Sequence, residues 1–182
     1  MKLPVRPAWE GGHRVPFLAR WPGRIPAGVR SDDLICLVDF MATAAAAADV
    51  PLPRDAGPDS FSFLPALKGE KFERGAAVIL SSYTGMLAVR EGNWVLILGR
   101  GSGGSTTEYF KRYGMRLEEL GRSTTGWAMK GMEPDPSLPP GQLYNLAKDR
   151  GEAVNVYKEN PEIVKRLTSL VVDYRARGRS RT

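Results

Sequence analysis

Length, composition and charge place this sequence among ordinary globular domains and exclude several kinds of site. The chain has 182 residues, which is long enough to bury one sizeable core. Its residues are 42% hydrophobic and 25% charged, as is ordinary for a globular protein. It holds one cysteine, Cys36, and one histidine, His13, so one chain can form neither an internal disulfide nor a cysteine–histidine zinc cluster. No apolar run reaches the ~20 residues of a membrane span, and residues 1–4 do not resemble a signal peptide. We therefore expect no membrane partner, and the compartment stays open.

The net charge of +6 is concentrated at the two ends of the chain. Residues 1–30 contain six basic residues and one acidic residue, and residues 165–182 have the same balance. A basic tail can bind nucleic acid or another anion, but no nucleic-acid motif accompanies the charge here. We expect no nucleic-acid partner and a solvated last helical turn, whose cations suit a helix C-terminus. Anion binding by the basic N-terminal segment remains an alternative.

The first part of the chain predicts one strand and one helix. Residues 15–21 are mostly apolar and predict a short buried strand. Ser31 precedes two aspartates and an apolar helical pattern, which predicts a capped helix that ends near Ala48, before two prolines. Residues 51–75 are expected to form a loop with a short helical turn at about residues 63–67.

The second part of the chain predicts an antiparallel sheet. Residues 76–83 are rich in strand formers, and residues 86–98 predict a hairpin that turns at Glu91-Gly92-Asn93. Residues 99–140 are expected to be mostly loop, with one short helix near Leu117. Residues 142–146 predict a further short strand.

A helix is predicted to close the chain. Asn160-Pro161 provides a cap and a first helical residue. The apolar stripe that follows consists of Ile163, Leu167, Leu170, Val171 and Tyr174. Because an apolar stripe must be buried, we expect this helix to cover the sheet.

Four patches in chain order resemble the C-terminal part of the sulfatase family. They are Trp9-Glu10-Gly11-Gly12-His13-Arg14-Val15-Pro16-Phe17 with Arg20-Trp21-Pro22-Gly23; Asp39 with Pro51 and Gly57-Pro58-Asp59-Ser60-Phe61; Leu87-Ala88-Val89-Arg90-Glu91-Gly92-Asn93-Trp94; and Gln142-Leu143-Tyr144-Asn145-Leu146 with Asp149, Glu152 and Asn155. Together they cover nearly the whole chain, and their order and spacing are those of the family.

The resemblance implies an α/β fold: the C-terminal portion of an alkaline-phosphatase-like sandwich, with a small antiparallel sheet of about four strands covered by a C-terminal helix. Residues 1–75 would then be a remnant of the large α/β domain, and residues 76–182 a subdomain of sheet and helix. Full-length relatives are expected to hydrolyse sulfate esters with a formylglycine, made from Cys or Ser, and with calcium.

The catalytic groups that the resemblance implies have no counterpart in this sequence. Cys36 precedes Leu37-Val38-Asp39, which does not fit the formylglycine motif, and Ser137 lacks the motif's arginine. No cluster supplies the six or so oxygen ligands of a calcium ion. Val5 stands where many members carry a sulfate-binding lysine. We therefore expect no catalytic residue, metal ligand or cofactor in this chain, which would supply scaffold and cleft wall and be inactive alone.

Two groups of residues are candidates for supporting roles. Glu10 and Arg14 are expected to form a buried ion pair around Gly11-Gly12, whose glycines allow close backbone approach or positive φ. The glycine-rich loop with Arg100, Ser102 and Ser105 could border a substrate cleft or bind an anion through its backbone N–H groups, although a solvent loop is favoured.

Other functions remain open. The chain could be an interaction module that self-associates or complements a partner, such as a missing N-terminal sulfatase domain. It could also belong to a related phosphate- or phosphonate-ester hydrolase, because that superfamily shares the scaffold.

Overall fold

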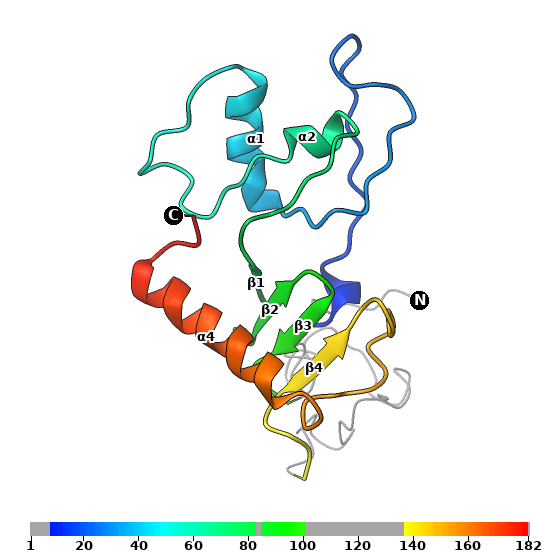
Figure 1. The fold of residues 1–182 in the computed structure, drawn as a ribbon, viewed down its shortest axis with the longest axis vertical. Helices are drawn as coiled ribbons and strands as arrows, with labels where there is room; N and C mark the ends of the chain where they lie inside the picture. The colour runs from blue at the N-terminus through cyan, green and yellow to red at the C-terminus, as the bar shows by residue number, and fades with distance from the viewer. Residues whose placement is uncertain (1–7, 83–84, 101–136, 182) are drawn as a thin grey trace, which may run out of the picture. The chain divides into compact units, whose positions relative to one another are not determined.

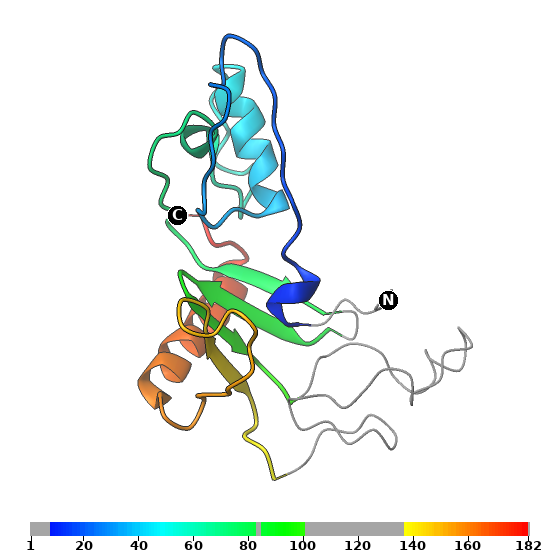
Figure 2. The same cartoon turned by 90° about the vertical axis from the view of Figure 1, so that its right-hand side faces the viewer.

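The computed structural model describes residues 8–82, 85–100 and 137–181, and the chain divides into two compact units (Figures 1 and 2). Unit 1 comprises Met1–Val15 with Ile79–Val171, and unit 2 comprises Pro16–Val78 with Val172–Thr182. The predicted division after residue 75 concerns the parts of a larger protein and stays a prediction. Within the described ranges, no helix is long and apolar enough to cross a membrane.

Unit 1 is built on a four-stranded sheet, as predicted, in the order β1-β2-β3-β4. Its strands are β1 Val78–Ser81, β2 Leu87–Glu91, β3 Trp94–Ile97 and β4 Gln142–Asn145. The predicted hairpin is confirmed, since β2 and β3 pair antiparallel with Glu91 opposite Trp94. Gly92 turns the hairpin at a φ of 56°, in the left-handed region that glycine adopts easily. β4 pairs antiparallel with β3, with Tyr144 opposite Val95.

Both faces of the sheet are covered by other parts of unit 1. Alternate residues of each strand point to opposite faces, so each face has its own set of buried side chains. One face carries the core residues Ala88, Val95, Ile97 and Tyr144, against which Ala8 and Trp9 pack, just before the short 3-10 helix η1 Glu10–Gly12. The opposite face carries Val89, Leu96 and Leu143, which are fully buried. Figures 1 and 2 show α4 and η1 on opposite sides of the strands.

The closing helix α4 spans Pro161–Arg177 and begins where the sequence predicts. Leu167 and Val171 of its apolar stripe are buried. Arg166, beside them, forms an ion pair with Glu91 of β2. This pair lies on the same face of the sheet as Val89, so the predicted cover of the sheet by the helix is confirmed.

In unit 2 the predicted helix is shorter than expected. It consists of the 3-10 turn η2 Leu37–Asp39 and the α-helix α1 Phe40–Ala47. The prediction that it starts at Ser31 is wrong, because residues 31–36 are not helical and the bond from the Asp33 N–H to the Ser31 hydroxyl, at 3.1 Å, belongs to a local turn. The predicted short helical turn is confirmed as α2 Leu64–Leu67.

The predicted strand at residues 15–21 is also wrong. This segment has no strand structure, and Leu18 is 93% exposed. Pro16 has no N–H to donate. Within the described residues, no strand lies beside this segment to pair with the backbone groups of its other residues. Apolar composition alone therefore does not make a strand here, because an extended segment also needs a neighbour for its backbone groups.

The last helical turn carries Arg175 and Arg177, which are exposed as expected, whereas the residues after the helix are bonded to the loop that follows α1. The guanidinium of Arg181 donates to the carbonyl of Pro53 at 2.6 Å, and Arg179 donates to the carbonyl of Arg54. Between them, the N–H of Ser180 donates to the Asp59 carboxylate at 2.7 Å. The tail thus ties down the loop after α1 within unit 2.

Candidate functional site

Glu10 lies at the centre of a buried polar cluster in unit 1, called here the Glu10 cluster and formed by Glu10, Arg90 and Glu152. The carboxylate of Glu10 pairs with Arg90, which alternation along β2 places on the face that η1 covers. The backbone N–H of Glu10 donates to Oε2 of Glu152 at 2.8 Å. One guanidinium therefore serves a site that contains two carboxyl groups.

The expected ion pair between Glu10 and Arg14 is wrong. Arg14 is exposed, and its backbone N–H, rather than its side chain, bonds to the carbonyl of Glu10 at 2.8 Å. In a 3-10 helix, with three residues per turn, a side chain four positions on does not stand above the first. Gly11 and Gly12 lie in this helix without positive φ, and a Cβ at Gly11 would meet open space.

Glu152 is held in an unusual position for a glutamate. It is 5% exposed and its φ is 53°, a left-handed conformation that costs a residue with a side chain about 1 kcal/mol or more. Its Oε1 has no hydrogen-bond partner among the described residues. Burial raises the pKa of Glu152 from 4.5 to about 7, with a smaller rise from the Glu10 and Asp149 carboxylates, against the lowering by Arg90 and by the Glu10 N–H.

A second polar network extends along the same sheet face. Oε1 of Gln142 accepts the indole N–H of Trp9 at 3.1 Å and the hydroxyl of Tyr144 at 2.8 Å. The Gln142 amide donates in turn to the carbonyl of Gly99 at 3.0 Å. Burial raises the pKa of Tyr144, so its hydroxyl stays neutral and acts as a donor. These bonds fix Trp9 against the sheet rather than create an open site.

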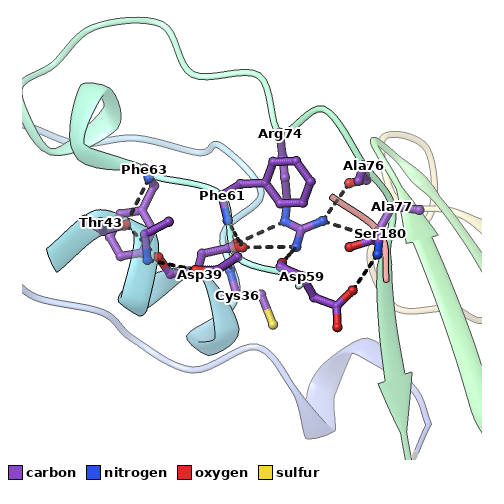
Figure 3. Close-up of polar contacts among 12 residues, drawn as sticks. Cys36, Asp39, Thr43, Asp59, Phe61, Phe63, Arg74, Ala76, Ala77 and Ser180 are labelled. Carbon is purple, nitrogen blue, oxygen red and sulfur yellow. Dashed lines mark hydrogen bonds and ion pairs between the residues drawn. The ribbon is translucent and has the colours of Figure 1, made fainter. Parts of the chain in front are cut away.

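Unit 2 contains the most completely bonded ion pair in the described structure, called here the Asp39 cluster and formed by Asp39 and Arg74 (Figure 3). Nε and Nη2 of Arg74 each donate to one Asp39 oxygen at 3.0 Å. The N–H groups of Cys36 and Phe61 donate to the same carboxylate, each at 3.0 Å. The side chain of Arg74 is 3% exposed and that of Asp39 is 0% exposed.

The remaining donors of Arg74 are also used. Nη1 donates to the carbonyls of Ala76 and Ala77, and Nη2 donates to the carbonyl of Asp59 at 2.9 Å. The guanidinium also lies over the Phe61 ring, 4.6 Å from its centroid. Because every N–H of the guanidinium is occupied, Arg74 joins three chain segments and has no donor left for a ligand.

The glycine-rich loop is only partly described. Nε of Arg100 donates to the carbonyl of Leu138 at 2.9 Å, which anchors one end of the loop. Ser102 and Ser105 lie outside the described residues, as does Val5, so the predicted cleft and anion roles stay predictions.

The described residues hold no evident reaction centre. Cys36 is half-buried at the start of η2, where its backbone N–H donates to Oδ2 of Asp39 at 3.0 Å. Across the described ranges, no three His, Cys, Asp or Glu side chains are grouped to hold a metal ion. The residues that sequence reasoning missed are the cations Arg74 and Arg90, which lie 35 and 80 residues from their partners.

Comparisons with known proteins agree with the sequence motifs. No protein-family model matches the sequence. The N-acetylgalactosamine-6-O-sulfatase of Bacteroides thetaiotaomicron is 31% identical over 170 residues, which cover 93% of this chain and 29% of that protein. Arylsulfatase G of Rattus norvegicus is 30% identical over 172 residues, which cover 91% of this chain and 29% of its own length.

The fold has a counterpart among solved structures. A sulfatase described with glycosaminoglycan metabolism in Bacteroides thetaiotaomicron superposes with a TM-score of 0.51 and 26% identity. The match covers 76% of this chain and 24% of that structure. The chain thus spans less than a third of the length of the curated relatives it matches.

Proposed function

This chain belongs to the sulfatase family and corresponds to a C-terminal part of its longer members, and we propose that it supplies scaffold and cleft wall to a sulfuric-ester hydrolase. The observation that carries the proposal is the extent of the similarity: nearly the whole chain aligns with under a third of each relative. The two clusters support it, because Asp39 and Arg74 are saturated by internal bonds and Glu10 is paired with Arg90. Such groups position backbone rather than substrate.

The reacting groups of a sulfatase would come from outside this chain in our proposal. Calcium and formylglycine, which the family implies, do not fit the residues present, because Cys36 lacks the motif and the described carboxylates are engaged or dispersed. We therefore derive no catalytic step for this chain.

The first prediction is that the purified chain does not hydrolyse 4-nitrophenyl sulfate above background, with or without added calcium. The physical reason is that the sequence carries no formylglycine motif, whose hydrated aldehyde would be the nucleophile that attacks sulfur. A spectrophotometric assay beside an active sulfatase checks this, and Cys36→Ala serves as the matched control. Turnover that survives repurification and disappears in Cys36→Ala would refute the proposal. A parallel assay with 4-nitrophenyl phosphate tests the related phosphate-ester hydrolase.

A second candidate function, self-association, is favoured by exposed apolar side chains in unit 2. They are Phe17, Leu18, Trp21, Leu37, Val38, Phe40, Met41 and Val50. A groove of about 340 Å³ runs beside α1, lined by its alanines and by Val50, Leu52 and Phe61. Burial of apolar surface is worth about 25 cal/mol per Å², so these residues favour contact with a second copy of the chain or with a partner.

We therefore predict that the chain dimerises or aggregates at micromolar concentration through residues 9–50. Light scattering coupled to size exclusion measures the mass. Leu18→Ser with Leu37→Ser should weaken association, since both side chains are exposed at 93% and 77%, whereas Val154→Ser, which changes an exposed residue of unit 1, should not. A clean monomer with strong hydrogen-exchange protection across residues 15–48 would show that this segment is covered by the chain itself.

A further inference from the structure

The carboxyl group of Glu152 joins two distant parts of unit 1. Its Oε2 accepts the N–H of Glu10, which is 142 residues away in the sequence, and this bond holds η1 to the loop that follows β4. The left-handed backbone at Glu152 aims the side chain into the cluster at a conformational cost. Oε1, without a partner among the described residues, is the oxygen left to carry a proton.

We propose that Glu152 is a proton-controlled latch, which holds the segment of residues 8–12 on the sheet when protonated and loosens it when ionised. When Oε1 is protonated, Oε2 remains a carbonyl oxygen and still accepts the Glu10 N–H. When Glu152 is ionised, two carboxylates share one desolvated site with the single guanidinium of Arg90, which is already bonded to Glu10.

Among the described residues, four charged or titratable groups lie around Glu152. Glu10 faces it from η1, Arg90 from β2, Tyr144 from β4 and Asp149 from its own loop. Tyr144 stays neutral, so the carboxylates of Glu10 and Asp149 oppose the ionisation of Glu152, whereas the Glu10 N–H and the Arg90 guanidinium favour it. His13, just after η1, is the one imidazole of the chain and needs its own control.

The sign of the pH effect follows from the raised pKa of Glu152. The unfolded chain loses this proton near pH 4.5, whereas the folded chain keeps it until about pH 7. In that window the folded state binds more protons, so the docking of residues 8–12 weakens as pH rises and levels off above about pH 7.

Hydrogen exchange of the full chain between pH 5 and pH 8.5 tests the latch. After correction for intrinsic exchange, opening of residues 8–14 should rise on the order of 10–100-fold between pH 5 and pH 8.5, because the carboxyl has a pKa of 4.5 when undocked and of about 7 when docked. Glu152→Gln keeps the accepting carbonyl but cannot ionise, so its profile should be flat. Glu159→Gln, at an exposed glutamate, and His13→Asn should behave as the parent chain.

Other outcomes would overturn the proposal. A pH-dependent profile that persists in Glu152→Gln, or one that His13→Asn abolishes, assigns the effect to another group. If Glu152→Gln does not fold, ¹³C NMR titration of the parent chain decides instead: a Glu152 carboxyl that titrates near 4.5 excludes the latch, and one near 7 supports it.

Discussion

Asp39→Asn should lower the free energy of unfolding of unit 2 by about 3–5 kcal/mol, the cost of leaving one member of a buried ion pair without its partner. The guanidinium of Arg74, 3% exposed, would keep its charge and face the amide N–H₂ group of the new asparagine. The N–H groups of Cys36 and Phe61 would also lose the charge on their acceptor. A loss of this size is a large part of the stability of an ordinary domain.

Hydrogen exchange across residues 36–64 measures this effect locally, and denaturant unfolding measures it for the whole chain. Asp32→Asn is the matched control, because Asp32 is an exposed aspartate just upstream and should change the free energy by less than about 0.5 kcal/mol. Adding Arg74→Met to Asp39→Asn should restore part of the loss, since no unpaired charge then stays buried. Equal effects of Asp39→Asn and Asp32→Asn would mean that the pair does not hold unit 2 together.

Elements with local signals were predictable from the sequence. The β2–β3 hairpin follows from alternating residues around Glu91-Gly92-Asn93, and α4 follows from the apolar stripe after Asn160-Pro161. In both cases the residues that specify the element lie inside it. The sulfatase resemblance added the order of the elements, and the solved relative with a TM-score of 0.51 agrees with it.

Features that depend on distant partners were not predictable. The helix starts at Leu37 rather than Ser31 because Asp39, fixed by Arg74, accepts the Cys36 N–H, and nothing near Ser31 signals this. Arg14 is the basic residue nearest to Glu10 in the sequence and was therefore predicted as its partner. The observed partner is Arg90 on β2, 80 residues away. The alternation of residues along β2 could have predicted that Arg90 lies on the covered face of the sheet. It could not have predicted that Glu10 is the residue that Arg90 contacts there.

Leu167→Ala should lower the free energy of unfolding by about 2–5 kcal/mol, because it empties a fully buried site on α4 and leaves a cavity against the sheet. At about 2–4 °C per kcal/mol for a chain of this size, the melting temperature should fall by roughly 4–20 °C. Thermal unfolding followed by circular dichroism measures the shift. The ion pair of Arg166 with Glu91 stays intact in this variant, so the loss reports packing rather than charge.

Two matched variants on the same helix separate docking from helix propensity. Lys165→Ala changes an exposed residue two positions before Leu167, and Val172→Ala shortens an apolar side chain that is 60% exposed. Both should stay within about 0.5 kcal/mol of the parent chain, because neither removes buried contacts. If Val172→Ala costs as much as Leu167→Ala, the apolar content of the helix matters more than its orientation. If Lys165→Ala does so, α4 is not docked on the sheet through its buried stripe.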